Sequence, residues 1–276
     1  MKNNKVIIVL LVLMAVIKIT PILAQNEIKE QLLVPLSDPA KSGSLKVELV
    51  HGSIKVVGYA GKEVVIDAET NANPNKKEKN DELASGMKRI SNRGGLELSA
   101  EEKNNKVVVT SHTVRQPVNL TIKVPQQFSL KVSTVNNGDI VIENINGELE
   151  VNNVNGDITL TNVSGSAVAN TVNGVIKANF KSVTDAPMAF TTLNGNVDVT
   201  FPVTTKMNVK VKSDRGEIYS DFDIDVDKTT PKGVRTSQNG MYKVSVDDWI
   251  QGKVNGGGSE IMMKNMHGNI YIRKAK

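Results

Sequence analysis

The stretch from Val135 to Phe180 reads VNNGDIVIENINGELEVNNVNGDITLTNVSGSAVANTVNGVIKANF. It carries a glycine every nine residues, and aliphatic side chains stand two and four places after most of these glycines, as Ile158 and Leu160 do after Gly156. Asparagine fills most of the flanking positions. A fixed short period of this kind is typical of a repeat architecture. The glycines of the period are Gly138, Gly147, Gly156, Gly165 and Gly174.

One unit of the repeat has the pattern of a β-strand followed by a turn. In residues 154–162, Ile158 and Leu160 alternate with Asp157 and Thr159, which gives one apolar and one polar face. The Asn155-Gly156 pair accepts positive φ at little cost and predicts a turn between strands. Burial of three aliphatic side chains does not offset the entropy lost by nine ordered residues. The units must therefore stack on one another to be stable.

Two stackings fit a nine-residue period. One is an antiparallel meander with an Asn-Gly hairpin at each corner, and the other is a β-solenoid in which two units, about eighteen residues, make one rung. Like residues recur in columns, and stacked rungs of a solenoid place like residues on one another. A meander would give those columns no reason to persist. The pattern therefore favours an all-β fold, a β-solenoid of short strands with Asn-Gly turns.

The same construction extends beyond the nine-residue period. Gly195 and Gly216 follow Gly174 at a spacing of 21 residues, and residues 45–54 and 209–218 resemble residues 130–140. Alternating strands in the amino-terminal half are interrupted by a polar excursion. We expect a signal peptide at 1–24, an N-terminal β-strand region at 25–131 with a polar loop near 71–95, and a β-solenoid repeat region at 132–276, continuous with the preceding strands.

The amino terminus has the pattern of an export signal. Lys2 and Lys5 precede an apolar run, and Ala24 provides a small residue at a cleavage point before Gln25. An uncleaved anchor is the alternative, although the run is short for a bilayer span. The sequence contains no cysteine, which excludes disulfides and an amino-terminal lipidated cysteine. We expect an exported protein in the periplasm, on the outer surface or outside the cell, with no membrane span after cleavage.

The charge of the mature chain gives no indication of a nucleic-acid partner. Residues 1–24 hold three lysines and no acid, so the formal net charge falls from +5 to +2 when they are removed. Acidic and basic residues are interspersed along the remainder, unlike the basic patch of a nucleic-acid-binding protein.

The chain is poor in residues that perform catalysis. His51, His112 and His267 lie far apart, without the spacing of metal ligands. No Gly-x-Ser-x-Gly nucleophile turn is present. We therefore predict a protein that is not an enzyme and that needs no cofactor.

The nine-residue period is also found in calcium-binding proteins, so a calcium site is the alternative to consider. Calcium-binding β-rolls carry several glycines and an aspartate in each turn. Here each unit has one glycine, and the acidic column of Asp139, Glu148 and Asp157 ends at Ser166 and Val175. We interpret the column as an outward polar row that limits edge aggregation, and expect no metal.

Aromatic residues are too few to indicate a sugar-processing cleft. The chain has one Trp, four Tyr and five Phe. We expect Trp249 to close an end of the solenoid, since terminal rungs need caps, and Phe201, Tyr219 and Phe222 to serve as core or cap residues. A polysaccharide-acting β-helix enzyme is the catalytic alternative.

Several segments resemble the putative-adhesin family of exported bacterial β-strand-repeat proteins, whose shared domain has no known function. The resemblance lies in residues 134–140, 154–165 and 171–176, and further along in 193–202, 216–222 and 256–261. It covers most of the mature chain. It implies an extended β-solenoid at the bacterial envelope, and it transfers no catalytic residues.

These observations predict a non-enzymatic envelope protein, an adhesin-like scaffold that binds an unknown surface or envelope partner through extended polar faces. A regulatory binding module in envelope-stress response is the alternative, because some members of the family are linked to such signalling. The residues singled out as structural turns of the repeat are Gly138, Gly147, Gly156, Gly165, Gly174, Gly195 and Gly216.

Overall fold

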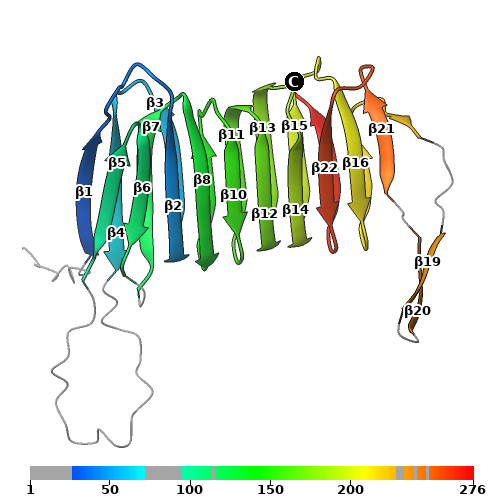
Figure 1. The fold of residues 1–276 in the computed structure, drawn as a ribbon, viewed down its shortest axis with the longest axis horizontal. Helices are drawn as coiled ribbons and strands as arrows, with labels where there is room; N and C mark the ends of the chain where they lie inside the picture. Colours follow the sequence, from blue (N-terminus) through cyan, green and yellow to red (C-terminus); the bar gives the residue numbers. More distant parts are fainter. Residues whose placement is uncertain (1–26, 72–94, 114–115, 228–232, 239–240, 247–248) are drawn as a thin grey trace, which may run out of the picture.

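The protein is a flattened solenoid made of two long β-sheets that face each other (Figure 1). The computed structural model describes residues 27–71, 95–113, 116–227, 233–238, 241–246 and 249–276. The expected signal peptide at 1–24 and nearly all of the polar loop near 71–95 lie outside the described residues.

Each sheet contains one strand from every rung. Sheet A has, in spatial order, β1 (Glu27–Pro35), β4 (Glu63–Asn71), β7 (Val118–Pro125), β3 (Ile54–Tyr59), β9 (Ile140–Glu143), β11 (Ile158–Gly165), β13 (Ile176–Val183), β15 (Val197–Phe201), β23 (Ile270–Lys274) and β17 (Ile218–Ser220). Sheet B has β18 (Asp225–Val226), β21 (Ile250–Val254), β16 (Met207–Ser213), β22 (Ser259–Asn265), β14 (Met188–Asn194), β12 (Ala167–Asn173), β10 (Leu149–Asn153), β8 (Phe128–Asn136), β2 (Gly43–His51), β6 (Lys106–Ser111) and β5 (Leu98–Lys103). A separate hairpin joins β19 (Gly233–Gln238) to β20 (Met241–Val246).

Strand pairing confirms the solenoid and excludes the meander. In sheet B, Leu149 of β10 pairs in parallel with Ala167 of β12, and in sheet A, Ile158 of β11 pairs in parallel with Ile176 of β13. Both pairs are 18 residues apart, which is two nine-residue units. One rung is therefore a sheet B strand followed by a sheet A strand.

The aliphatic columns point into the space between the two sheets. Ile140, Ile158 and Ile176 follow one another along sheet A, and each is 0% exposed. Where the rungs lengthen to 21 residues, three phenylalanines fill the core. The ring of Phe180 packs against those of Phe190 and Phe201, with centroids 6.0 and 5.4 Å apart. Each rung thus buries its apolar face against its neighbours and the opposite sheet.

The order of the rungs in space differs from their order in the sequence at both ends. The β2–β3 rung lies between the β6–β7 and β8–β9 rungs, and the β22–β23 rung lies between β14–β15 and β16–β17. Antiparallel strands then close the ends: β4 pairs with β7 and β5 with β6 at one end, and β21 pairs with β16 at the other. These strands end the parallel ladder and blunt its exposed edges.

A carboxylate secures the entry segment at the first end. Glu102 accepts hydrogen bonds from the Ser37 amide (3.1 Å), the Ser37 hydroxyl (2.9 Å) and the Asn105 amide (2.8 Å). These donors, with the Ser37 amide the largest contributor, hold the pKa of Glu102 below the ordinary glutamate value of 4.5. The carboxylate thereby connects the segment after β1 to the β5–β6 turn.

We predict that this connection weakens in acid. Because the pKa of Glu102 is lowered on folding, its contribution to stability is present above pH 4.5 and is lost as the pH falls through the lowered pKa. The chemical shift of the Ser37 amide should therefore change in that range, and Glu102→Gln should remove the change. Glu101→Gln, at an exposed neighbouring position, is the control and should leave it intact.

Candidate functional site

The glycines of the nine-residue period alternate between two corners of the solenoid. Gly138, Gly156, Gly174, Gly195 and Gly216 lie where a sheet B strand passes into a sheet A strand, and we call this the glycine corner. Gly147 and Gly165 lie at the opposite corner, where the chain returns to sheet B, and we call this the return corner. The alternation follows because nine residues are half a rung.

Close backbone contact between rungs requires glycine at the glycine corner. A Cβ atom on Gly174 would overlap the carbonyl oxygen of Gly156 in the preceding rung, and one on Gly156 would overlap that of Gly138. Positive φ, the reason expected from the Asn-Gly pairs, is a smaller part of the explanation. Gly138 and Gly174 have no positive φ, whereas Gly156 (157°), Gly195 (154°), Gly52 (118°) and Gly268 (120°) at the same corner do, so close contact is the constraint that all of them share. Left-handed φ also occurs at asparagines such as Asn144 (59°) and Asn162 (55°).

A column of buried polar side chains satisfies the carbonyl groups of the glycine corner. Thr171 Oγ1 donates to the Gly156 carbonyl (3.0 Å), and Thr192 Oγ1 donates to the Gly174 carbonyl (2.9 Å). These threonines are 5% and 2% exposed. Without such donors the tightly stacked carbonyls would be left unpaired in the interior. The same role is taken by Thr134, Asn153, Asn265 and Ser213 in the other rungs.

We predict that Gly174→Ala destabilises the protein by about 1–3 kcal/mol or more, because the added methyl forces two rungs apart. Denaturant unfolding of the two proteins measures the difference. Gly95→Ala is the matched control, since a Cβ at Gly95 meets nothing within 4 Å. Equal losses from both substitutions would contradict the steric explanation.

Thr171→Val tests the buried column. Valine has nearly the shape of threonine but cannot donate to the Gly156 carbonyl, so we expect a loss of about 1–3 kcal/mol in the free energy of unfolding. Thr159→Val, on the outer face of β11, should change stability by less than about 0.5 kcal/mol.

The acidic residues do not form one column. Asp139 and Asp157 follow the glycine corner, whereas Glu148 lies at the return corner. Asp139 Oδ1 accepts from the Asp157 amide (2.9 Å), and Asp157 Oδ1 accepts from the Val175 amide (2.7 Å), so these carboxylates connect successive rungs. No group of three or more His, Cys, Asp or Glu suited to a metal ion occurs among the described residues.

The three histidines lie in different rungs and are not brought together. His112 Nε2 is 3.4 Å from the Ser99 hydroxyl, and His267 Nε2 is 3.0 Å from Arg215 Nη1. His51 is the last residue of β2. None of these arrangements places a nucleophile beside a base oriented by a third group.

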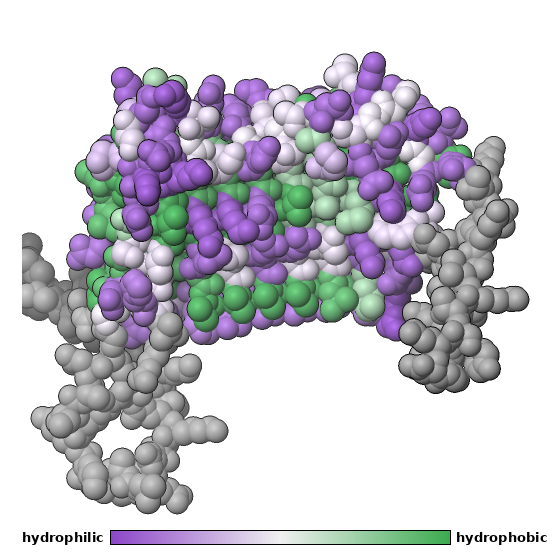
Figure 2. Space-filling model, viewed as in Figure 1, coloured by the Kyte–Doolittle hydropathy of each residue, from purple (hydrophilic) through white to green (hydrophobic). Residues whose placement is uncertain are grey.

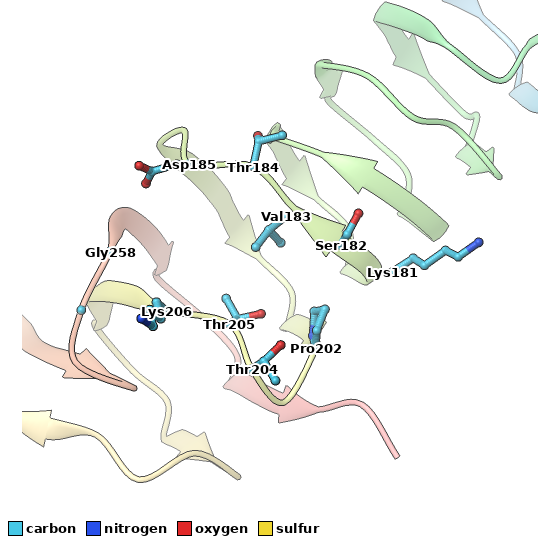
Figure 3. Close-up of a pocket in the computed structure, with 11 residues that line it drawn as sticks. Lys181, Ser182, Val183, Thr184, Asp185, Pro202, Thr204, Thr205, Lys206 and Gly258 are labelled. Atoms are coloured by element: carbon cyan, nitrogen blue, oxygen red, sulfur yellow. The ribbon is translucent and has the colours of Figure 1, made fainter.

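One hollow lies beside the return corner, where the rungs are longest (Figure 3). It has a volume of about 520 Å³ and is lined by residues 181–185, 202, 204–206 and 257–258. Asn255 Nδ2 donates to the carbonyls of Val203 (3.1 Å) and Thr205 (2.8 Å), which holds two of these segments together. Residues 181–185 and 202–206 are return-corner segments of the lengthened rungs, and residues 257–258 belong to the connection from β21 to β22 within sheet B.

Polar groups and charges of both signs, Lys181, Lys206 and Asp185, line this hollow. Thr205 is 4% exposed, and its Oγ1 has no hydrogen-bond partner within the described part of the chain. Lys206 belongs to the same wall, while the Lys181 ammonium extends away from Thr205 (Figure 3). A second hollow of about 550 Å³ adjoins it through Lys181 and adds Arg273 and Lys274. Both hollows are open; the first has charges of both signs, and the charged side chains that line the second are cationic. The sequence does not indicate these two hollows, because each is lined by segments that are far apart along the chain.

The aromatic residues divide between core and surface. Phe201 and Phe222 are 0% and 5% exposed, as core or cap residues should be. Tyr219 is not a core residue, because its side chain is 52% exposed; it lies on β17, the terminal strand of sheet A. Its ring stacks on Tyr271 with centroids 5.4 Å apart. Trp249 precedes β21 near one end, with Lys210 Nζ 5.1 Å from its ring centroid.

The outer face of sheet A carries an unbroken column of side chains from rung to rung. Thr159, Lys177 and Asp198 pair in succession, and Asp198 pairs with Tyr271 beside Tyr219. Asp198 forms two hydrogen bonds with Arg273 (2.7 and 3.0 Å), and this carboxylate raises the pKa of the guanidinium. Adjacent strands lie about 4.8 Å apart, so the column is a regular array of polar groups with an aromatic end.

Three solved structures are similar to this chain. A putative cell adhesion protein from Clostridium sporogenes ATCC 15579 is 12% identical over 90% of this chain and 100% of its own, with a TM-score of 0.39. A putative adhesin from Bacteroides fragilis NCTC 9343 is 12% identical over 91% and 98%, with a TM-score of 0.38. A putative adhesin from Parabacteroides merdae ATCC 43184 is 8% identical over 90% and 96%, with a TM-score of 0.26. No curated protein matches the chain.

A family model described as Toastrack DUF4097 matches residues 129–249. The match begins in β8 and ends at Trp249, so it includes the regular rungs from β8 to β17. The β22–β23 rung follows it in sequence, although that rung lies within the matched rungs in space. The match to residues 129–249 confirms the resemblance to a putative-adhesin family seen in the sequence.

Proposed function

We propose that this protein is an exported, non-enzymatic scaffold of the cell envelope that binds a surface or matrix partner through an extended polar face. The observation that carries the proposal is the outer column of sheet A, which runs through Thr159, Lys177 and Asp198 to the tyrosine pair. Groups that repeat at each rung match a long or repeating ligand. The interior is filled by aliphatic side chains, and the hollows at the return corner are open.

Chemistry and position both support sheet A as the binding face. Thr159, Lys177 and Asp198 offer hydrogen-bond donors and acceptors, and Tyr219 at the sheet edge adds an exposed aromatic ring. Aromatic rings bind the apolar faces of ligands while polar neighbours fix their orientation. A weak contact repeated along the column gives useful avidity without a deep pocket.

Export is supported by the amino-terminal pattern of Lys2, Lys5, the apolar run and Ala24. No helix within the described residues is long and apolar enough to cross a membrane. Protease treatment of intact cells, compared with lysed cells, distinguishes the outer surface from the periplasm. Loss of the protein from intact cells would indicate the surface.

We predict that binding depends on the outer face of sheet A. Retention of the mature chain on envelope fractions and on immobilised polysaccharides and matrix proteins should fall about tenfold or more in the combined variant Thr159→Ala, Lys177→Ala and Tyr219→Ala, because several repeated contacts are lost together. The matched control is Lys131→Ala with Glu150→Ala, an exposed ion pair (2.8 Å) on the outer face of sheet B. Unfolding curves should show that both variants remain folded.

Equal retention of the wild type and the sheet A variant on every surface would refute binding through this face. Co-purification of a dedicated signalling protein from cells under envelope stress, without retention on any surface, would instead support the regulatory alternative.

A further inference from the structure

An apolar ridge runs along the molecule beside the glycine corner. Six successive rungs each contribute one aliphatic side chain to it, at or just after the end of the sheet B strand; five of these side chains are exposed and that of Val154 is half-buried. Figure 2 shows a row of hydrophobic atoms along this edge. The ridge consists of Val50, Val135, Val154, Val172, Leu193 and Met266.

The ridge is unusual because aliphatic side chains normally avoid such exposure in a continuous row. Val50 is 47% exposed, Val172 38% and Leu193 41%. With about 4.8 Å between neighbouring strands, the six side chains form a straight line of roughly 24 Å. Scattered exposed hydrophobic residues are ordinary, whereas contiguous apolar surface commonly marks an interaction site.

The row of side chains beside the ridge on sheet B carries opposite charges at its two ends. Glu48 flanks Val50 at one end, and Lys264 flanks Met266 at the other. The residues between them are uncharged. They are Ser133, Asn152, Asn170 and Thr191, paired in succession from β8 to β14.

We propose that the ridge is a dimer interface in which a second copy of this chain packs with its ridge antiparallel to the first. A two-fold axis between Val154 and Val172 places Val50 against Met266 of the other copy, and Val135 against Leu193. The same operation brings Glu48 of each copy to Lys264 of the other. The interface is isologous, as in most closed homodimers.

A second copy matches this surface in both spacing and charge. Two identical ridges have the same strand repeat, so all six positions are in register at once. The antiparallel arrangement makes the two charged ends complementary, which favours it over a parallel one. A stable interface buries roughly 800 Å² per partner, so the uncharged rows on both sides of a one-residue ridge must also make contact. Asn155, Asn173 and Asn194 form the row on the corner side.

The first experiment measures the mass of the full mature chain in solution by sedimentation equilibrium over a concentration series. We expect a reversible dimer, weakened about tenfold or more by Val172→Lys, because each new charge enters the apolar interface opposite Val154 of the other copy and close to the second new charge across the two-fold axis. Val168→Lys is the matched control. It is on the same strand, β12, and is 39% exposed, but it lies outside the ridge, so the dimer should persist.

The second experiment exchanges the flanking charges. Glu48→Lys alone and Lys264→Glu alone should each weaken the dimer, and the double variant should restore it, because each copy again presents opposite charges to the other. A monomeric wild type at all concentrations, equal effects of Val168→Lys and Val172→Lys, or no recovery in the double variant would overturn the proposal. Sheet A remains uncovered in the dimer, so these outcomes are independent of the proposed binding face.

Discussion

The close contact between backbones at the glycine corner is the constraint on which the structure depends. Each rung places a carbonyl oxygen where a side chain on the next rung would begin, as Gly156 does beneath Gly174. Glycine permits this approach, and Thr171 supplies the hydrogen bond that makes the buried carbonyl tolerable. With the corner fixed, the strands on both sides continue in parallel register, and the aliphatic columns and the outer polar columns follow.

Much of the fold could be predicted because its information is local and repeated. The nine-residue spacing of Gly138 to Gly174 and the alternation around Ile158 specify strand, corner and inward face in every unit. The candidate binding region was less predictable. The hollow at Thr205 is lined by segments that are far apart along the chain, and Tyr219 is exposed because its strand lies at a sheet edge. Such properties depend on which rungs become neighbours, and similar rungs carry little sequence information about that.

Two features show how a repeat protein varies its surface while keeping its core. Lengthening a rung from 18 to 21 residues leaves the glycine corner in place and enlarges the return corner, where the hollows form. Phe180 and Phe190 occupy the wider core at the same level. Variation is therefore concentrated on one side of the solenoid, away from the contacts that hold successive rungs together.

The placement of the β22–β23 rung has a consequence for the order of folding during synthesis. The ribosome releases β16 and β17 before β22 and β23, yet β16 and β17 reach the rest of the solenoid through that later rung. Growth from β8 to β15 can follow translation step by step, whereas completion of the far end must wait for the last segment. The β22–β23 rung, synthesised last, thus joins the β14–β15 rung to the β16–β17 rung, both of which were synthesised earlier.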